Sequence, residues 1–263
     1  MNILVFKIKT IPDIEAGQAI FDLQGLDDKS TVKAMRHMHQ QKTGSETLPL
    51  HLHKIVAISI VYRGMGDDMG KWLAVRSLGD ENSTETDLLQ QFFDEVEGRT
   101  PTLVSWDGSD VDLPIIHYRA LKNSISAPAY WEMGENNAEF RHDNYLNRQH
   151  QRHTDLKDVL ASYHRHASAP LNDIAKLLGF PGSLGVASSQ LWDAFQAGGI
   201  SGIRHSGETD VLNIYLIYLR YQLMRGEISG DELEKEFTLL REVLDNEPQS
   251  GGAHLLEFSK HWV

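Results

Sequence analysis

The first apolar run of the chain, residues 2–13, is interrupted by two lysines, Lys7 and Lys9. A buried strand normally reads as an unbroken apolar run, and lysine is rarely buried without a partner. Side chains two positions apart on a strand point to the same face, so these two cations project together. The pattern therefore predicts a core strand that carries two ammonium groups on one face.

The rest of the chain alternates between strand-like and helix-like segments. Strands are predicted where β-branched and apolar residues cluster: 54–63, its hairpin partner 71–79 across a polar turn at 65–70, and 100–106. Helices are predicted where apolar residues recur with helical spacing: 28–44, 83–98, 112–124, 155–163, 171–179, 188–198, 209–226 and 230–246. Residues 127–153 are predicted to form a long surface loop, and a polar segment with a short tail is predicted to follow residue 246.

Three helix ends carry recognisable signals. Gly44 is a plausible stop for the helix at 28–44. Asn82 and Glu85 have the spacing of a capping box for the helix at 83–98. Pro114 lies in the first turn of the helix at 112–124, where its missing N–H costs nothing.

Strands that come first, with helices between and after them, predict a central mixed sheet flanked by helices, an α/β fold. We expect residues 1–226 to form one such domain. Residues 227–263 are expected to be a helical extension that packs on the same domain. The sequence contains no internal repeat and no low-complexity tract.

The amino-acid composition limits the kinds of site and partner that this chain can have. The net charge is −12, so binding to nucleic acid requires a local basic patch. Cysteine is absent, which excludes disulfides, thiolate metal sites and a cysteine nucleophile. No apolar run approaches the roughly 20 residues of a membrane span, and the N-terminus lacks the features of a signal peptide. A cytoplasmic protein with no membrane partner is expected.

The candidate site lies near the end of the first strand. Ligands of open α/β sheets bind at the carboxyl ends of the strands. An acidic pair at positions 7 and 9 would form half of a divalent-cation site, because Mg²⁺ binds carboxylate and phosphate oxygens. In this chain the pair is basic.

Five blocks of sequence together resemble one known family. The blocks are 2–13, 48–59, 100–121, 144–160 and 208–220. In order and spacing they resemble the predicted 3′–5′ exonucleases related to the proofreading domain of family-B DNA polymerases, from Met1 to about Gly226. These belong to the DEDD group of the RNase H-like fold. The resemblance implies that fold and a two-metal cleavage of phosphodiesters, in which Mg²⁺ or Mn²⁺ ions hold the attacking and leaving oxygens.

The motifs that carry this chemistry are only partly kept. The Asp-x-Glu positions of the family fall on Lys7 and Lys9. The aspartates of the second and third motifs match Asp112 and Asp210. The tyrosine of the third motif is replaced by Ser206, next to Gly207. His205, five residues before Asp210, has the spacing of the histidine base in a sister branch of the group.

This replacement changes the charge of the site. Four carboxylates would require divalent cations, whereas two lysines and two aspartates balance one another. We therefore expect Lys7 and Lys9 to form ion pairs with Asp112 and Asp210, and no catalytic metal pair and no other cofactor to bind. If a metal ion binds after all, the resemblance assigns Mg²⁺ or Mn²⁺ to Asp112 and Asp210.

Three residues near the strand ends are candidates for contact with nucleic acid. Thr10 and Ile11 follow the altered motif, where relatives touch the terminal nucleotide; packing at the strand exit is the alternative. Trp106 ends the strand at 100–106 and could stack on a base, unless it is a core tryptophan.

His153 and Asp155 match a family block that bounds the substrate cleft, and a helix N-cap by Thr154 or Asp155 is the alternative.

The candidate basic patch lies between residues 141 and 165. Its cations are Arg141, Arg148, Arg152, Lys157 and Arg165, interleaved with Tyr145 and several histidines. Such a patch suits a phosphate backbone. The alternative is a solvated surface with salt bridges to Asp143 and Asp158.

Three functions remain open from the sequence. The first is a pseudonuclease that has lost two-metal catalysis and binds either the 3′ ends of single-stranded DNA or RNA or a protein partner. The second is a working 3′–5′ exonuclease that uses Asp112 and Asp210 with Asp107 or Glu208, and His205 as base. The third is a non-catalytic scaffold. The sequence predicts no oligomeric state.

Overall fold

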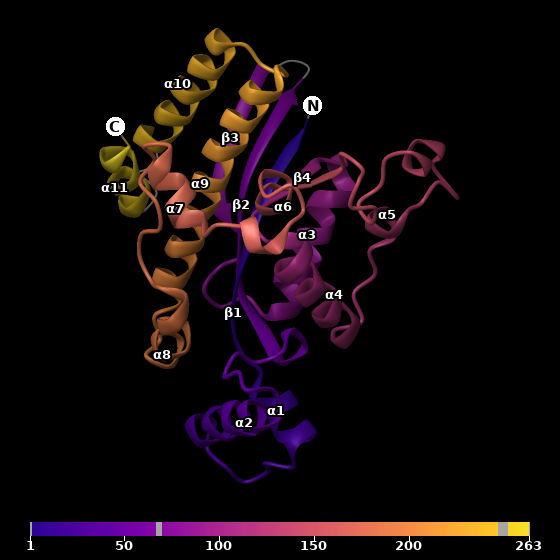
Figure 1. The fold of residues 1–263 in the computed structure, drawn as a ribbon, viewed down its shortest axis with the longest axis vertical. Helices are drawn as coiled ribbons and strands as arrows, with labels where there is room; N and C mark the ends of the chain where they lie inside the picture. Colours follow the sequence, from indigo (N-terminus) through magenta and orange to yellow (C-terminus); the bar gives the residue numbers. More distant parts are fainter. Residues whose placement is uncertain (1, 67–69, 247–251, 263) are drawn as a thin grey trace.

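The structure is a computed structural model that describes residues 2–66, 70–246 and 252–262. Its strands form one sheet in the order β3-β2-β1-β4-β5 (Figure 1). Their bounds are β1 (Ile3–Pro12), β2 (His53–Gly66), β3 (Gly70–Ser77), β4 (Thr102–Ser105) and β5 (His153–Asp155). β1 runs antiparallel to β2 and parallel to β4. The predicted mixed sheet is therefore confirmed.

Helices cover both faces of this sheet. The α-helices of the described residues are α1 (Ile14–Phe21), α2 (Asp28–Thr43), α3 (Glu85–Arg99), α4 (Leu113–Lys122), α5 (Pro128–Trp131), α6 (Leu156–Leu160), α7 (Leu171–Leu177), α8 (Leu191–Gln196), α9 (Ile200–Arg225), α10 (Gly230–Asn246) and α11 (Ala253–His261). Figure 1 shows α9, α10, α11 and α7 on one side of the sheet and α3, α4 and α5 on the other.

The alternation of side chains along β1 separates the two cores. Leu4, Phe6 and Ile8 belong to the core that includes residues of α3 and α4. Val5 points the other way, into the core formed with α9, α10 and α11. Because residues two apart share a face, Lys7 and Lys9 lie on the α9 side of the strand. On this face of β1, the C-terminal half therefore carries the cations Lys7 and Lys9, whereas the N-terminal half is apolar.

The long helix α9 begins nine residues earlier than predicted and packs directly on the sheet. Its residues from Val211 to Leu219 are almost all buried. Gly207 permits the close approach, because a Cβ at this position would lie 2.3 Å from Ser59 Oγ on β2. The absence of a side chain at position 207 thus brings α9 against β1 and β2.

A separate small lobe extends from one end of the sheet. It contains α1, which the sequence pattern did not reveal, and α2, whose predicted stop at Gly44 is confirmed. Figure 1 shows the two helices beyond the ends of β1 and β2, away from the other helices. The lobe has its own small core of Met35, Leu48 and Leu52.

The capping box predicted for the third helix was misplaced. Thr84, not Asn82, is the N-cap of α3, and its partner is Asp87. The Thr84 side chain accepts a hydrogen bond from the Asp87 backbone N–H, and the Asp87 carboxylate accepts one from the Thr84 backbone N–H. The box is therefore shifted by two residues from the one that the spacing suggested.

The prediction of a long surface loop over 127–153 was wrong in part. This segment contains α5 and a short 3₁₀ helix (Ala138–Arg141), and its aromatic residues Tyr130, Phe140 and Tyr145 are buried in the α3–α4 core. It ends in the edge strand β5, which pairs with β4 in parallel. The loop is therefore anchored by three aromatic rings rather than solvated along its length.

Further boundaries also differ from the predictions. The helix predicted over 155–163 is shorter, since α6 ends at Leu160. The tail after residue 246 contains α11, whose Leu255 and Phe258 are buried against α9 and α10. The predicted turn at 65–70 includes residues 67–69, which lie outside the described residues. Within the described ranges, no helix is long and apolar enough to cross a membrane.

Candidate functional site

Lys7 and Asp112 form the first ion pair of the site. The Lys7 Nζ atom donates hydrogen bonds to both carboxylate oxygens of Asp112, at 3.0 and 2.8 Å, and to the backbone carbonyl of Trp106 at 3.3 Å. The Asp112 side chain is 2% exposed and that of Lys7 is 20% exposed. The predicted pair is thus present, with the carboxylate fully buried and the ammonium group at the edge of solvent.

Lys9 and Asp210 form the second pair. Lys9 Nζ donates to Asp210 Oδ2 at 2.8 Å, and the lysine side chain is 6% exposed. Asp210 lies on α9, so this bond joins the helix to the middle of the sheet. Lys9 is opposite Ala57 in the register with β2, immediately before a bulge in the pairing. Both predicted ion pairs are therefore confirmed.

A tight turn after β4 places Asp112 near Lys7. Asp107 has a left-handed backbone (φ 66°) and is followed by a short π-helical turn (Gly108–Asp112) that leads into α4. The Asp155 carboxylate holds this turn by accepting hydrogen bonds from the backbone N–H groups of Asp107 and Ser109, at 3.0 and 2.8 Å. The same carboxylate caps α6 through the Lys157 backbone N–H. Asp155 is therefore an N-cap that also fixes the shape of the site.

A third pair completes a groove on the α9 side of the sheet. Lys157 Nζ donates to Asp107 Oδ2 at 2.6 Å. These two residues, Lys7 and Asp210 line a cavity of about 500 Å³. Its other polar lining residues are Ser168, Asn172, Ser183 and Ser188. Each ammonium group that borders this groove therefore faces an aspartate, so the groove carries balanced charge.

Burial and pairing act together on the ionisation of the first pair. Burial raises the pKa of the Asp112 carboxyl to about 6, although the Lys7 ammonium opposes this change. For Lys7, burial lowers the pKa, but the attraction of the neighbouring aspartates outweighs it and the pKa is raised. Both members of the pair are therefore charged at neutral pH. The Asp112 carboxyl is ionised there because the Lys7 ammonium group lies beside it.

His205 does not join these residues. Its ring stacks on the ring of His254 of α11, with centroids 3.8 Å apart and an angle of 12° between the planes. The two histidines line a different cavity, together with Gly185 and Thr209. The predicted role of His205 as a base beside Asp210 therefore does not fit the structure.

Ser206 is buried and packed against a loop. It is 1% exposed, and its hydroxyl donates to the Ile203 carbonyl at 2.8 Å. A Cβ on Gly185 would lie 3.2 Å from the Ser206 Cβ. Thr209 bonds the same loop by donating to the Leu184 carbonyl at 3.1 Å. The loop around residue 185 therefore packs against Ser206, and nothing in the sequence marked this contact.

Glu208, an alternative metal ligand in the sequence analysis, faces away from the groove. Its carboxylate accepts hydrogen bonds from the Ser77 backbone N–H at 2.8 Å and from His254 Nε2 at 2.6 Å. Burial raises the pKa of Glu208, but the bonds from His254 and Ser77 outweigh it and hold the pKa below its usual value. Glu208 therefore joins α9 to β3 and α11.

The candidate nucleotide contacts at the strand ends are mostly internal. Ile11 is 4% exposed and Trp106 is 5% exposed, and Trp106 packs in the core around α9. Thr10 is half-buried, with its hydroxyl 3.0 Å from His53 Nδ1. The burial of Trp106 favours the alternative of a core tryptophan.

The arginines of the predicted basic patch have internal partners. Arg148 forms ion pairs with Asp158 and, at 3.5 Å, with Asp110. Arg152 donates to the Asp143 carbonyl at 2.5 Å and lies over the Phe140 ring. The salt bridges to Asp143 and Asp158 are those of the alternative interpretation. His153 is also internal, with Nε2 2.8 Å from Ser105 Oγ.

A buried ion cluster at the far end of β1 escaped the sequence analysis. Arg119 of α4 bonds the carboxylates of Asp13 and Glu85, and Glu85 also accepts from the Ile55 backbone N–H at 2.6 Å. Asp13 in turn caps α1. The position of Asp13 directly after an apolar strand was the available signal. Across the described ranges, no three histidine, aspartate or glutamate side chains form a group that could hold a metal ion.

Comparisons with known proteins found one matching family and similar solved structures. A sequence model of one family, the predicted 3′–5′ exonucleases related to the exonuclease domain of PolB, matches residues 45–262. No curated protein matches the chain. A solved structure similar to it is the family B DNA polymerase from the hyperthermophilic archaeon Pyrobaculum calidifontis, with 11% sequence identity and a TM-score of 0.47. The likeness covers 98% of this chain and 27% of the polymerase, so the chain spans about a quarter of that protein.

The residues matched by the family model include part of the candidate site. The matched range contains Asp112, Ser206 and Asp210, whereas β1 with Lys7 and Lys9 precedes it. It also includes all of α10 and α11. The mixed sheet with helices on both faces is consistent with the α/β RNase H-like fold that the resemblance implied. The match covers most of the chain, which therefore belongs to the family of predicted 3′–5′ exonucleases related to the exonuclease domain of PolB.

Proposed function

We propose that this protein is a non-catalytic member of its family, which holds the ends of single-stranded nucleic acid in the groove without cleaving them. The observation that carries this proposal is the pairing of Lys7 with Asp112 and of Lys9 with Asp210. Both lysines lie on the strand face where the resemblance places two carboxylates.

The donor set does not suit a pair of divalent cations. An ammonium group has three N–H donors and no acceptor, so it cannot bind a metal ion. Mg²⁺ prefers carboxylate oxygens, and both oxygens of Asp112 already accept hydrogen bonds from Lys7. A second requirement, a side chain that positions the attacking water, is also unmet, since Ser206 is buried and bonded to its own helix.

The groove keeps features that suit a nucleic-acid end. Lys7 and Lys157 present ammonium groups at its wall, and three serines and an asparagine add further polar groups. Phosphate oxygens accept hydrogen bonds from such side chains, and charged donors give the stronger bonds. In this proposal Lys7 supplies positive charge where metal ions act in catalytic relatives.

The test combines cleavage and binding. End-labelled single-stranded DNA and RNA are incubated with the full chain and Mg²⁺ or Mn²⁺, and binding is measured by fluorescence anisotropy at several salt concentrations. We expect no cleavage ladder, binding that weakens as salt rises, and weaker binding by Lys157→Gln. Lys176→Gln on α7 is the matched control, because it removes an exposed cation outside the groove.

Two outcomes would overturn the proposal in different ways. A metal-dependent ladder that disappears in Asp210→Asn would make the protein a working exonuclease. Absence of binding to either strand type at low salt would reject the nucleic-acid ligand.

A non-catalytic scaffold is the second candidate, and exposed apolar side chains favour it. Leu121 of α4 is 80% exposed and Trp131 of α5 is 51% exposed. The two belong to neighbouring elements, since the ring of His117 on α4 lies 5.0 Å from that of Trp131. This function predicts self-association in analytical ultracentrifugation that Leu121→Ser weakens. A monomeric wild-type chain would count against self-association.

A further inference from the structure

The helix α2 carries a concentration of positive charge that the acidic chain shows in few other places. It contains the four cations Lys29, Lys33, Arg36 and Lys42 against one acidic residue, Asp28. Its formal charge is therefore +3, whereas the whole chain carries −12. This helix lies in the lobe that projects from the end of the sheet (Figure 1).

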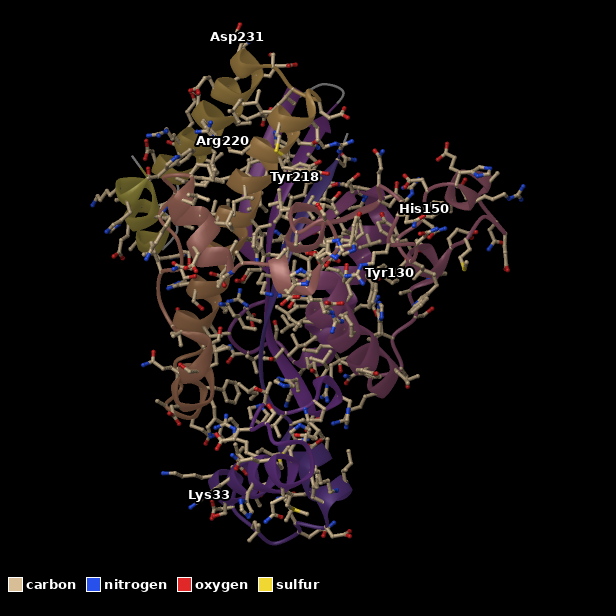
Figure 2. The ribbon with its side chains drawn as sticks, viewed as in Figure 1. Lys33, Tyr130, His150, Tyr218, Arg220 and Asp231 are labelled. Carbon is tan, nitrogen blue, oxygen red and sulfur yellow. The ribbon has the colours of Figure 1, made fainter. Side chains whose placement is uncertain are left out.

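Three of these cations form a stripe on the outer face of the helix. At about 100° per residue, Lys29, Lys33 and Arg36 lie within about 60° of one another and extend over about 10 Å along the axis. All three are exposed. Figure 2 shows Lys33 on the outer side of the lobe. We call these three residues the α2 stripe.

The α2 stripe differs from the basic groups near the groove in its lack of ion-pair partners. Its three residues form no ion pair with any side chain in the described parts of the chain. By contrast, Lys157, Arg148 and Arg165 near the groove each face an aspartate. The charge of the stripe is therefore available to an external polyanion, while that of the groove is largely compensated.

We infer that the α2 stripe is a docking surface for the phosphate backbone of a nucleic acid. Nucleic-acid backbones carry closely spaced negative charges, and lysines and arginines that neutralise them release counterions, which drives binding. A row of unpaired cations along one helix face is complementary to such a backbone. The fold to which the lobe is attached belongs to an exonuclease family, which favours a nucleic acid over other polyanions.

An anionic membrane is the competing partner, and the apolar face of α2 argues against it. Helices that lie on membranes insert an exposed apolar face among the lipids. Val32 and Met35 are 4% and 0% exposed and are covered within the lobe. The exposed residues of α2 itself are all polar or charged, which suits phosphates held in water.

This surface lies outside both the groove and the family match. Residues 28–43 precede the matched range, which begins at residue 45. The inference therefore does not depend on the groove holding an end. If both the groove and the α2 stripe bind nucleic acid, one nucleic-acid strand contacts the protein at two places. If only the α2 stripe binds, the protein binds nucleic acid whether or not an end is present.

The test is a salt series with matched charge variants of the full chain. The variant Lys29→Gln/Lys33→Gln/Arg36→Gln removes the stripe. The control Lys176→Gln/Lys235→Gln/Lys260→Gln removes three exposed cations from α7, α10 and α11, so that both variants have the same net charge. Fluorescein-labelled single-stranded and duplex DNA are the probes, and vesicles containing phosphatidylserine are the membrane probe. Urea unfolding checks that both variants keep the stability of the wild type.

We expect the stripe variant to lose about tenfold or more in affinity for DNA at low salt, and the control to lose little. Each phosphate contact contributes about 0.7 to the slope of log K against log salt for single strands, so the slope should fall by about 2. Equal losses in both variants, or binding to vesicles but not to DNA, would overturn the inference. Loss in Lys157→Gln without loss in the stripe variant would reject the α2 surface and leave the groove as the binding site.

Discussion

At the scale of single residues, Asp112 retains its charge because Lys7 faces it. The carboxylate is 2% exposed, and burial alone would keep it protonated near neutral pH. Removing one partner of a buried pair leaves an uncompensated charge, whereas replacing both by apolar groups is often tolerated. This asymmetry makes the pair open to a direct test.

Lys7→Met should lower the free energy of unfolding at pH 7 by about 3 kcal/mol, near the lower limit for buried pairs because Lys7 is partly exposed. Lys7→Met/Asp112→Leu should recover most of this loss. Lys157→Met, which breaks a more exposed pair, should cost about 1 kcal/mol or less. Urea unfolding measures all three, and a Lys7→Met variant as stable as the wild type would show that Asp112 does not need its cation.

The same variant should respond to pH in a defined direction. The pKa of Asp112 is raised to about 6 from an ordinary 3.8, so its contribution to stability is present below 3.8 and is lost as pH rises through 6. Without Lys7 the folded-state pKa should rise further. The deficit of Lys7→Met relative to the wild type should therefore be smaller at pH 5 than at pH 8.

His153 should make the protein sensitive to mild acid. Burial lowers the pKa of His153 to about 4 from 6.5, and its Nε2 lies 2.8 Å from Ser105 Oγ. A lowered histidine pKa gives stability that is present above 6.5 and lost as pH falls toward 4. His153→Gln, which can keep a bond to Ser105, should lose less stability between pH 7 and pH 5 than the wild type in urea unfolding. Equal losses in the two proteins would contradict this role.

At the scale of elements, the fit of α9 on the sheet depends on Gly207. Alanine is ordinarily the better helix former by about 1 kcal/mol. At position 207, however, its Cβ would meet Ser59 Oγ at 2.3 Å, and Ser59 is fully buried and bonded to Ser77. Overpacking of this kind costs about 1–3 kcal/mol. The steric cost should therefore exceed the gain in helix propensity.

Gly207→Ala should thus destabilise the protein by about 1–2 kcal/mol in urea unfolding. Gly202→Ala in the same helix is the matched control, because its Cβ would meet only Val186 at an ordinary 3.6 Å. That control should be neutral or stabilising. Removing the obstacle in Gly207→Ala/Ser59→Ala should restore part of the loss, and no recovery would point to a different cause.

Sequence patterns predicted elements better than they predicted which way side chains face. The strands and the long helices follow from apolar periodicity, which is strong where one face is buried. The resemblance to the exonuclease family also placed Lys7 and Lys9 with Asp112 and Asp210. The expectation for His205 failed, because its ring stacks on that of His254 and lines a cavity that does not include Asp210. Sequence patterns also missed β5, a three-residue strand whose position is set by pairing with β4.

At the scale of the whole molecule, charge is distributed unevenly. The candidate site, which includes the groove, pairs three lysines with three aspartates. The exposed face of α2 concentrates unpaired cations on a separate lobe. The family match extends through α10 and α11. The sequence predicted the helix α10 but not α11, because the apolar residues of α11 form too short a periodic pattern to identify a helix. The structure shows that α11 is stabilised by burial of its apolar residues against α9 and α10.

The central claim is that two lysines occupy the place of metal ions in this protein. Thermal melting with and without Mn²⁺ tests it most directly. A ligand at a hundredfold excess over its Kd stabilises a protein by about 2.7 kcal/mol, so a working metal site would raise the melting temperature measurably. We predict no shift for the wild type and a clear one for Lys7→Asp/Lys9→Glu. A Mn²⁺-dependent shift in the wild type that Asp112→Asn or Asp210→Asn removes would contradict the claim.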